Sequence, residues 1–144
     1  MSVFAGMRIS ASALQAERTR LDVITENIAN VETTRTPQGG PYRRRQVVLG
    51  ASQVSFGRLS RWEGVTPRHT GVRVLAVEPA PGDLPRIYNP GHPDADAEGY
   101  VTMPNVDLPT EMADLLVATR AYEANAAAFR SSRDLIRQCL SIMA

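Results

Sequence analysis

The feature that most constrains this chain is an apolar ladder along its C-terminal end. Its members alternate in steps of four and three: Leu108, Met112, Leu115, Thr119, Tyr122, Ala126, Phe129, Arg133, Ile136, Leu140 and Met143. This heptad spacing predicts a helix of about 54 Å with a nearly continuous apolar seam and Thr110 as its N-cap. A lone apolar stripe is usually the core side of a helix, but this length and regularity favour a coil that also meets neighbouring subunits.

A second amphipathic helix is predicted near the N-terminus, over residues 3–31. Its apolar residues recur in steps of three, four and seven and therefore share one helix face: Met7, Ala11, Leu14, Leu21, Ile24, Ile28 and Val31. The helix should end near Asn30, because threonines and then Pro37 follow. The economical arrangement pairs this helix with the C-terminal one as an antiparallel coiled coil.

The middle of the chain, residues 32–105, has a different composition. It contains nine of the ten prolines and nine of the ten glycines. Short alternating or β-branched runs predict strands at residues 46–49, 71–77 and 99–103. We therefore predict an α+β protein with three parts: an N-terminal helix (1–31), a small loop-rich β region inserted between the helices (32–105) and a C-terminal helix (106–144).

The charge pattern argues against a nucleic-acid partner. The net charge is only +1, and all 16 basic residues are arginine. The single basic cluster is Arg43–Arg45, which on a strand would project to two faces and is therefore more typical of an interface or a solvated edge. Trp62 fits either a core position or a contact anchor, and the sequence does not decide between them.

The chain holds little that would support catalysis or metal binding. Asp94, Asp96, Glu98 and Gly99 match the start of a calcium loop, but Asn105 stands where the bidentate glutamate belongs and prolines flank the segment. His69 and His92 are not at ligand spacing. Cys139 is predicted to be a half-buried structural thiol. We expect no cofactor, no metal and no small-molecule substrate.

Targeting signals are also missing from the sequence. The first residues lack a basic segment followed by an apolar core, and no apolar run approaches the ~20 residues that span a membrane. Taken alone, this predicts a cytoplasmic protein without membrane insertion. Export by a system that reads no cleavable signal stays open.

Several motifs resemble the bacterial flagellar rod and hook protein family. Asn27-Ile-Ala-Asn30 at the end of the first helix and Ala121-Tyr-Glu-Ala-Asn125 in the last helix resemble signatures of the whole family. The segments at residues 34–48, 89–96, 99–107 and 108–112 resemble those of its proximal rod proteins. The resemblance covers nearly the full length and is weakest over residues 51–87.

The resemblance implies a structural subunit rather than an enzyme. Such proteins pass unfolded through the flagellar type III export apparatus without a cleaved signal. They assemble in the periplasm, with copies of themselves and with other proximal and distal rod proteins, into the hollow driveshaft between motor and hook. Asn27 and Asn30 carry over as helix-end and packing residues without a catalytic role.

We expect the terminal helices to form the assembly interface. The predicted contact residues are Met7, Leu14, Leu21, Ile24, Asn27, Ile28, Asn30, Leu115, Thr119, Tyr122, Phe129, Arg133, Ile136 and Leu140. Thr119 and Arg133, the polar breaks in the ladder, are expected at contacts between subunits. Two alternatives stay open: a cytoplasmic coiled-coil adaptor whose small β region binds a partner, and a small cell-wall hydrolase.

Overall fold

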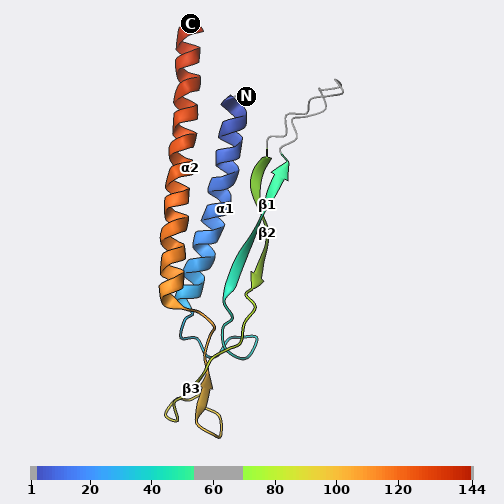
Figure 1. Cartoon of the computed structure of the whole chain (residues 1–144), viewed down its shortest axis with the longest axis vertical. Coiled ribbons are helices and arrows are strands. Elements are labelled where there is room, and N and C mark those ends of the chain that lie inside the picture. The colour runs from blue at the N-terminus through green and yellow to red at the C-terminus, as the bar shows by residue number, and fades with distance from the viewer. Residues whose placement is uncertain (1–2, 54–69, 144) are drawn as a thin grey trace.

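The computed structural model describes residues 3–53 and 70–143 and is dominated by two long helices. Helix α1 (Val3–Ala29) and helix α2 (Leu108–Met143) pack side by side and run in opposite directions (Figure 1). Between them in the sequence lie strands β1 (Arg45–Gln53), β2 (Thr70–Pro79), β3 (Arg86–Tyr88) and β4 (Tyr100–Thr102). The predicted α+β class with paired terminal helices is confirmed.

The contact between the helices is centred on small and polar residues. On α1 the buried positions include Ala5, Ala16 and Val23, and on α2 they are Glu111 and Ala118. The small side chain of Ala118, which is fully buried, lets the two backbones approach closely. Helix α2 is thus rotated about its axis so that these residues, and not a continuous row of large apolar side chains, lie at the centre of its buried face.

The apolar ladder therefore lies along one edge of the contact and not along its centre. Leu115, Ala126, Phe129 and Ile136 are half-buried. Their ladder neighbours Leu108, Met112, Thr119, Tyr122 and Arg133 are exposed, Met112 at 59%. The heptad spacing correctly predicted a long helix, but the centre of its buried face includes Glu111, which a count of apolar residues cannot identify.

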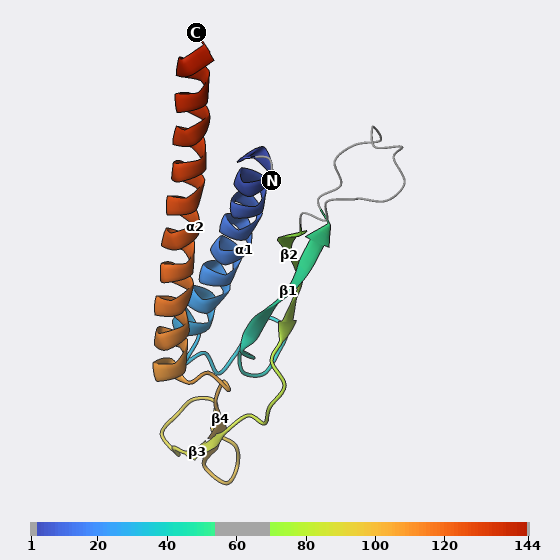
Figure 2. The same ribbon diagram turned by 45° about the horizontal axis from the view of Figure 1, so that its top comes forward.

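Helix α2 continues past the start of α1 at the end of the molecule away from the β strands β3 and β4 (Figures 1 and 2). Gly6, near the start of α1, lies opposite Ser132, since a Cβ on Gly6 would be 3.9 Å from the Ser132 Oγ. Among the residues that the structure describes, no helix lies beside the last turns of α2, and Leu140 and Ile142 are 61% and 84% exposed.

Strands β1 and β2 form a two-stranded antiparallel ribbon that packs on α1. The register shifts between Val48 and Leu49, which leaves Leu75 as an extra residue in β2. Its side chain lies over Gly50, where a Cβ would be 2.6 Å from Leu75 Cδ1. A side chain at position 50 would therefore require the exposed Leu75 side chain to move.

Strands β3 and β4 form a separate two-stranded sheet below the helices (Figure 2). The sequence predicted the strand around residue 100 but not β3. The ring of Tyr100 contacts the ring of Tyr88 edge to face, and the Arg86 guanidinium lies 5.4 Å from the centroid of the Tyr100 ring. Gly99 has a φ of +84°, and a Cβ there would be 2.9 Å from Tyr88 Cε2, so a side chain at this position would be strained.

The start of α2 differs from the prediction in one respect. Asp107, not Thr110, caps the helix: its carboxylate accepts the backbone N–H of Thr110 at 3.2 Å and also the Thr110 hydroxyl. Neither of the two helices, over the residues described, is long and apolar enough to cross a membrane.

Candidate assembly site

Asn27 in the last turns of α1 is the centre of a buried polar cluster. Its Nδ2 donates to the Arg45 carbonyl oxygen at 2.9 Å and to Glu111 Oε2 at 3.1 Å. Its Oδ1 accepts the Tyr42 hydroxyl and the Arg45 backbone N–H, both at 2.9 Å. The amide is 1% exposed, and both donors and both acceptor positions are filled. This side chain thus joins α1, α2 and the start of β1.

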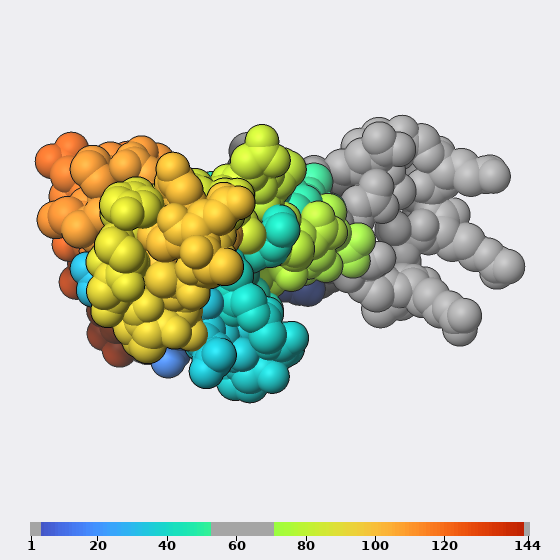
Figure 3. All heavy atoms as spheres, turned by 90° about the horizontal axis from the view of Figure 1, so that it is seen from below, coloured from blue at the N-terminus to red at the C-terminus, as the bar shows by residue number. Residues whose placement is uncertain are grey.

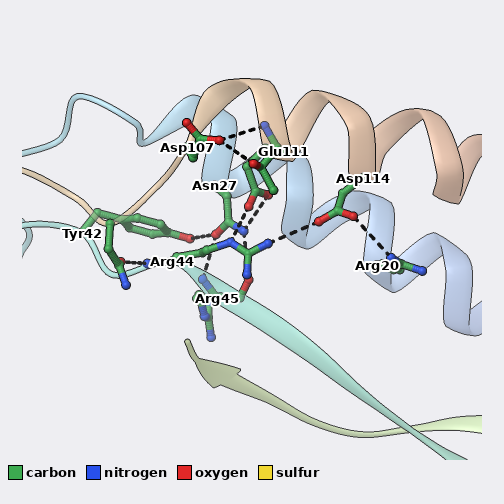
Figure 4. Close-up of polar contacts among 10 residues, drawn as sticks. Arg20, Asn27, Tyr42, Arg44, Arg45, Asp107, Glu111 and Asp114 are labelled. Atoms are coloured by element: carbon green, nitrogen blue, oxygen red, sulfur yellow. Dashed lines mark hydrogen bonds and ion pairs between the residues drawn. The ribbon is translucent and has the colours of Figure 1, made fainter. Parts of the chain in front are cut away.

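Glu111, which is 0% exposed, brings α2 into the same cluster (Figure 4). Its Oε1 accepts a hydrogen bond from Arg44 Nε. The Arg44 guanidinium also donates to Asp114 at 3.3 Å, and Arg20 of α1 lies 3.8 Å from the other Asp114 oxygen. A buried carboxylate is tolerated only when it is paired and hydrogen-bonded, and Glu111 has both kinds of partner.

We call Asn27, Tyr42, Arg44 and Glu111 the polar hub. Burial raises the pKa of the Tyr42 hydroxyl, and the nearby Glu26 carboxylate adds to this rise. The hydroxyl therefore stays protonated and donates to Asn27 across the ordinary pH range. Asn27 and Glu111 are 84 residues apart in the sequence, so the hub can form only when both terminal helices are in place.

Asn30 ends α1 through a second set of hydrogen bonds. Its Nδ2 donates to the Glu26 carbonyl oxygen at 2.8 Å, and its Oδ1 accepts the Thr33 hydroxyl at 3.1 Å. The chain then turns back so that the Tyr42 N–H reaches the Thr33 carbonyl oxygen at 3.0 Å. The two asparagines of the motif thus have different tasks: Asn27 joins elements and Asn30 shapes the turn.

The remaining predicted interface residues fall into two groups. Ile24 is buried, and a larger set is half-buried within the subunit: Met7, Leu14, Leu21, Ile28, Leu115, Phe129 and Ile136. Thr119, Tyr122, Arg133 and Leu140 are exposed. The Thr119 hydroxyl donates to the Leu115 carbonyl oxygen at 2.8 Å, and Arg133 pairs with the adjacent Asp134 at 3.2 Å.

Sequence reasoning missed most of the polar hub. The basic cluster at residues 43–45 is divided in the fold: Arg43 is exposed, Arg44 pairs with Glu111 and Arg45 pairs with Glu26. Glu111 looked like an ordinary acidic residue in the first turn of a helix. The Asn27–Asn30 motif and the family resemblance of residues 34–48 and 108–112 covered all four hub residues, but neither indicated that these residues would meet.

In the acidic turn that matches the start of a calcium loop, the protein itself engages the carboxylates of Asp94 and Asp96. Asp94 accepts the Thr34 hydroxyl at 2.8 Å and lies 3.5 Å from Arg35. Asp96 pairs with Arg86 and also accepts a hydrogen bond from the Tyr100 backbone N–H. This backbone hydrogen bond holds the pKa of the Asp96 carboxyl below its ordinary value. Among the residues described, no group of three or more acidic, histidine or cysteine side chains is arranged to hold a metal ion.

The prediction for Cys139 is wrong, because its thiol is exposed rather than half-buried. It lies on the part of α2 that extends past α1, where none of the described residues covers it. Trp62 and His69 lie outside the described residues.

Two family models match segments of this chain, and both describe flagellar basal-body rod proteins. Residues 7–35 match the family model described as flagella basal body rod protein, and residues 97–142 match the C-terminal model of the flagellar basal body rod FlgEFG proteins. These segments cover most of both helices and include Asn27 and Glu111 of the polar hub.

Full-length relatives agree with the two family models. The flagellar basal-body rod protein FlgC of Borreliella burgdorferi is 41% identical and that of Bacillus subtilis 40% identical, each over 99% of both chains. The FlgC of Escherichia coli O157:H7 is 34% identical over 93% of this chain and 92% of its own. The chain therefore belongs to the FlgC family and is a structural rod subunit of the flagellar basal body.

Proposed function

We propose that this chain is a subunit of the proximal rod and that it assembles through its terminal helices into the hollow driveshaft between motor and hook. Its neighbours are copies of itself and the other proximal and distal rod proteins. It travels unfolded through the flagellar type III export apparatus, without a cleaved signal, and folds in the periplasm. The role involves no catalysis, cofactor, small-molecule substrate, nucleic acid or membrane insertion.

The main support is a stripe on the side of α2 away from α1, which we call the outer stripe. Its members share one helix face and include no charged residue: Ala113, Val117, Ala124, Ala128, Ser131, Leu135 and Ile142. All are exposed, and Val117, Leu135 and Ile142 are more than half exposed. A helix with a second apolar face that the isolated chain leaves uncovered has a surface for a neighbouring subunit.

The position of Phe129 decides how the interface should be tested. Phe129 is half-buried on the edge of α2 that meets α1, so a charge there would disturb the subunit itself as well as any contact with a neighbour. Val117 lies on the outer stripe and is exposed. A charge at Val117 therefore tests assembly without entering the core of the subunit.

The test is complementation of a strain that lacks its own copy of the chain. We expect Val117→Asp to abolish swimming and to be absent from isolated basal bodies, because a neighbour would bury its charge. Gln15→Asp, which adds the same charge at an exposed position of α1, should swim. Normal motility of Val117→Asp with the protein present in basal bodies would show that the outer stripe is not an interface. Recovery of the wild-type chain only from the cytoplasm would favour an adaptor role.

A further inference from the structure

We propose that the polar hub sets the register between α1 and α2, and that the rest of their contact would accept a second register in which α2 is displaced by one heptad. The hub then selects one arrangement of the helices from two, in addition to stabilising it. The inference concerns a single folded chain, so it does not depend on the proposed rod function.

Two contacts define the register seen in the structure. At the hub, Asn27 Nδ2 of α1 lies 3.1 Å from Glu111 Oε2 of α2. Near the start of α1, a Cβ on Gly6 would lie 3.9 Å from the Ser132 Oγ. Between these two contacts each helix advances by 21 residues, which is three heptads. The helices therefore stay in step along the whole contact, as in a regular antiparallel pair.

The inward side of α2 carries a short side chain at every heptad step after the hub. Glu111 is followed at intervals of seven residues by Ala118, Asn125 and Ser132. Ala118 is buried, and Asn125 and Ser132 are half-buried. Sliding α2 by one heptad, about 10 Å, would bring Ala118 opposite Asn27 and move each short side chain to the place of the one before it. No large side chain would enter the contact, so shape discriminates weakly between the two registers.

The displaced register would also cover more apolar surface. In the structure α2 continues past the start of α1 (Figure 1), and Leu140 and Ile142 in this part are mostly exposed. They share heptad positions with Ala126 and Ala121, which are half-buried beside α1. The displacement would bring the last turns of α2 alongside the first turns of α1, and burial of apolar surface favours such a change. Apolar contact therefore does not explain the observed register.

The hub is what the displaced register would break. The two carboxylate oxygens of Glu111 accept hydrogen bonds from Asn27 and Arg44, and the side chain is fully buried. After the displacement the methyl group of Ala118 would face Asn27, and both donors would lose their acceptor. Buried polar groups without partners disfavour the wrong arrangement strongly. A single buried polar side chain fixes the register of a coiled coil in this way.

The hub end of the molecule contains a second restraint that must be separated from the hub. Figure 3 looks onto this end, where the loop that follows α1 (cyan) lies beside residues 80–107 (yellow to orange). Asn105, just before α2, accepts the Arg44 backbone N–H at 2.8 Å, and Asp94 accepts the Thr34 hydroxyl at 2.8 Å. These hydrogen bonds join loops and lie outside the contact between the helices. Asn105→Ala is therefore the control for a register held by the loops.

Cysteine pairs in the full chain can report the register directly. Gly6→Cys with Ser132→Cys, in a Cys139→Ser background, should form a disulfide in the observed register. Gly6→Cys with the natural Cys139 reports the displaced register, because residue 139 lies one heptad, about 10 Å, further along α2 and is out of disulfide reach in the observed one. With the hub intact, oxidation at low protein concentration should close the 6–132 pair and leave the 6–139 pair reduced.

Two changes to the hub test the proposal in both reporter backgrounds. The first replaces the hub by apolar side chains: Asn27→Leu, Tyr42→Phe, Arg44→Met and Glu111→Leu. The second exchanges two residues, Glu111→Ala with Ala118→Glu, and so moves the carboxylate by one heptad without changing the composition. In the exchange variant the 6–139 disulfide should replace the 6–132 disulfide. In the apolar variant both should form, with at least a tenfold rise in the ratio of 6–139 to 6–132.

Circular dichroism and urea unfolding of the reduced chains show whether each variant is folded. An exchange variant that keeps the 6–132 disulfide, or that loses its helices instead of changing register, would overturn the proposal, because the contact would then accept only one register. An apolar variant that is unfolded, or that forms only the 6–132 disulfide, would restrict the hub to a role in stability. Asn105→Ala should form only the 6–132 disulfide, and a 6–139 disulfide there would assign the register to the loops.

Discussion

The first and last turns of α2 place their side chains in opposite environments. At the first turn Glu111 is fully buried, and its two carboxylate oxygens bind Asn27 and Arg44. At the last turns Leu140, Ile142 and Cys139 are exposed. The buried end fixes how the subunit folds, because every polar atom there needs its partner. The exposed end contributes little to the fold of the subunit, because its apolar and charged side chains remain in contact with solvent.

The largest effect on stability should come from Glu111→Ala in the polar hub. The change removes one partner of a buried pair and leaves donors of Asn27 and Arg44 without an acceptor. We expect the free energy of unfolding to fall by about 3–5 kcal/mol, as measured by urea denaturation. Glu123→Ala, an exposed glutamate on the same helix, should change it little. A loss below 1 kcal/mol for Glu111→Ala would mean that the hub does not hold the helices together.

Ala118→Leu should have the next largest effect. Ala118 is fully buried at the contact between the helices, so three additional carbon atoms would push α1 and α2 apart. A loss of about 1–3 kcal/mol in the free energy of unfolding is expected from such overpacking. Ala113→Leu, on the exposed outer stripe, is the matched control and should be nearly neutral. Equal effects at both positions would contradict the observed rotation of α2.

Tyr42→Phe should weaken the hub by about 1 kcal/mol, because Asn27 Oδ1 loses one of its two donors. The difference should also depend on pH. The pKa of Tyr42 is raised in the folded chain, so its contribution is fully present below the unfolded value of about 10 and is lost as pH rises through the folded value. The stability gap between wild type and Tyr42→Phe should therefore narrow above pH 10. If the stability difference widened above pH 10, the predicted direction of the pH dependence would be wrong.

The smallest effect on the isolated subunit is expected for Val117→Ser with Leu135→Ser on the outer stripe. Both side chains are exposed, so the free energy of unfolding should change by no more than about 0.5 kcal/mol. Incorporation into basal bodies should nevertheless fall sharply, because the stripe loses its apolar surface. A large loss of stability would mean that the outer stripe contributes to the subunit core. The stripe and the polar hub would then no longer differ in their effect on stability.

Much of the fold could be predicted from the sequence because its signals are local. The heptad spacing after Leu108 and the periodicity between Met7 and Val31 identified both helices, and the prolines and glycines located the β region. Strand β3 was missed because Arg86-Ile-Tyr88 lies among prolines and is a strand only through its pairing with β4. The N-cap was misplaced because Asp107 and Thr110 both suit that position, and backbone geometry decides between them.

The sequence by itself determined that two long helices bracket a small β region and that Asn27-Ile-Ala-Asn30 ends the first of them. Only the tertiary structure decided which face of α2 is buried and which residues complete the hub. The physical reason is that helix periodicity depends on neighbours three or four residues apart. Glu111, by contrast, can be buried because its carboxylate accepts hydrogen bonds from Asn27 and Arg44, which are 84 and 67 residues away in the sequence. The end of α2 remains exposed for the complementary reason, that no distant segment described here returns to cover it.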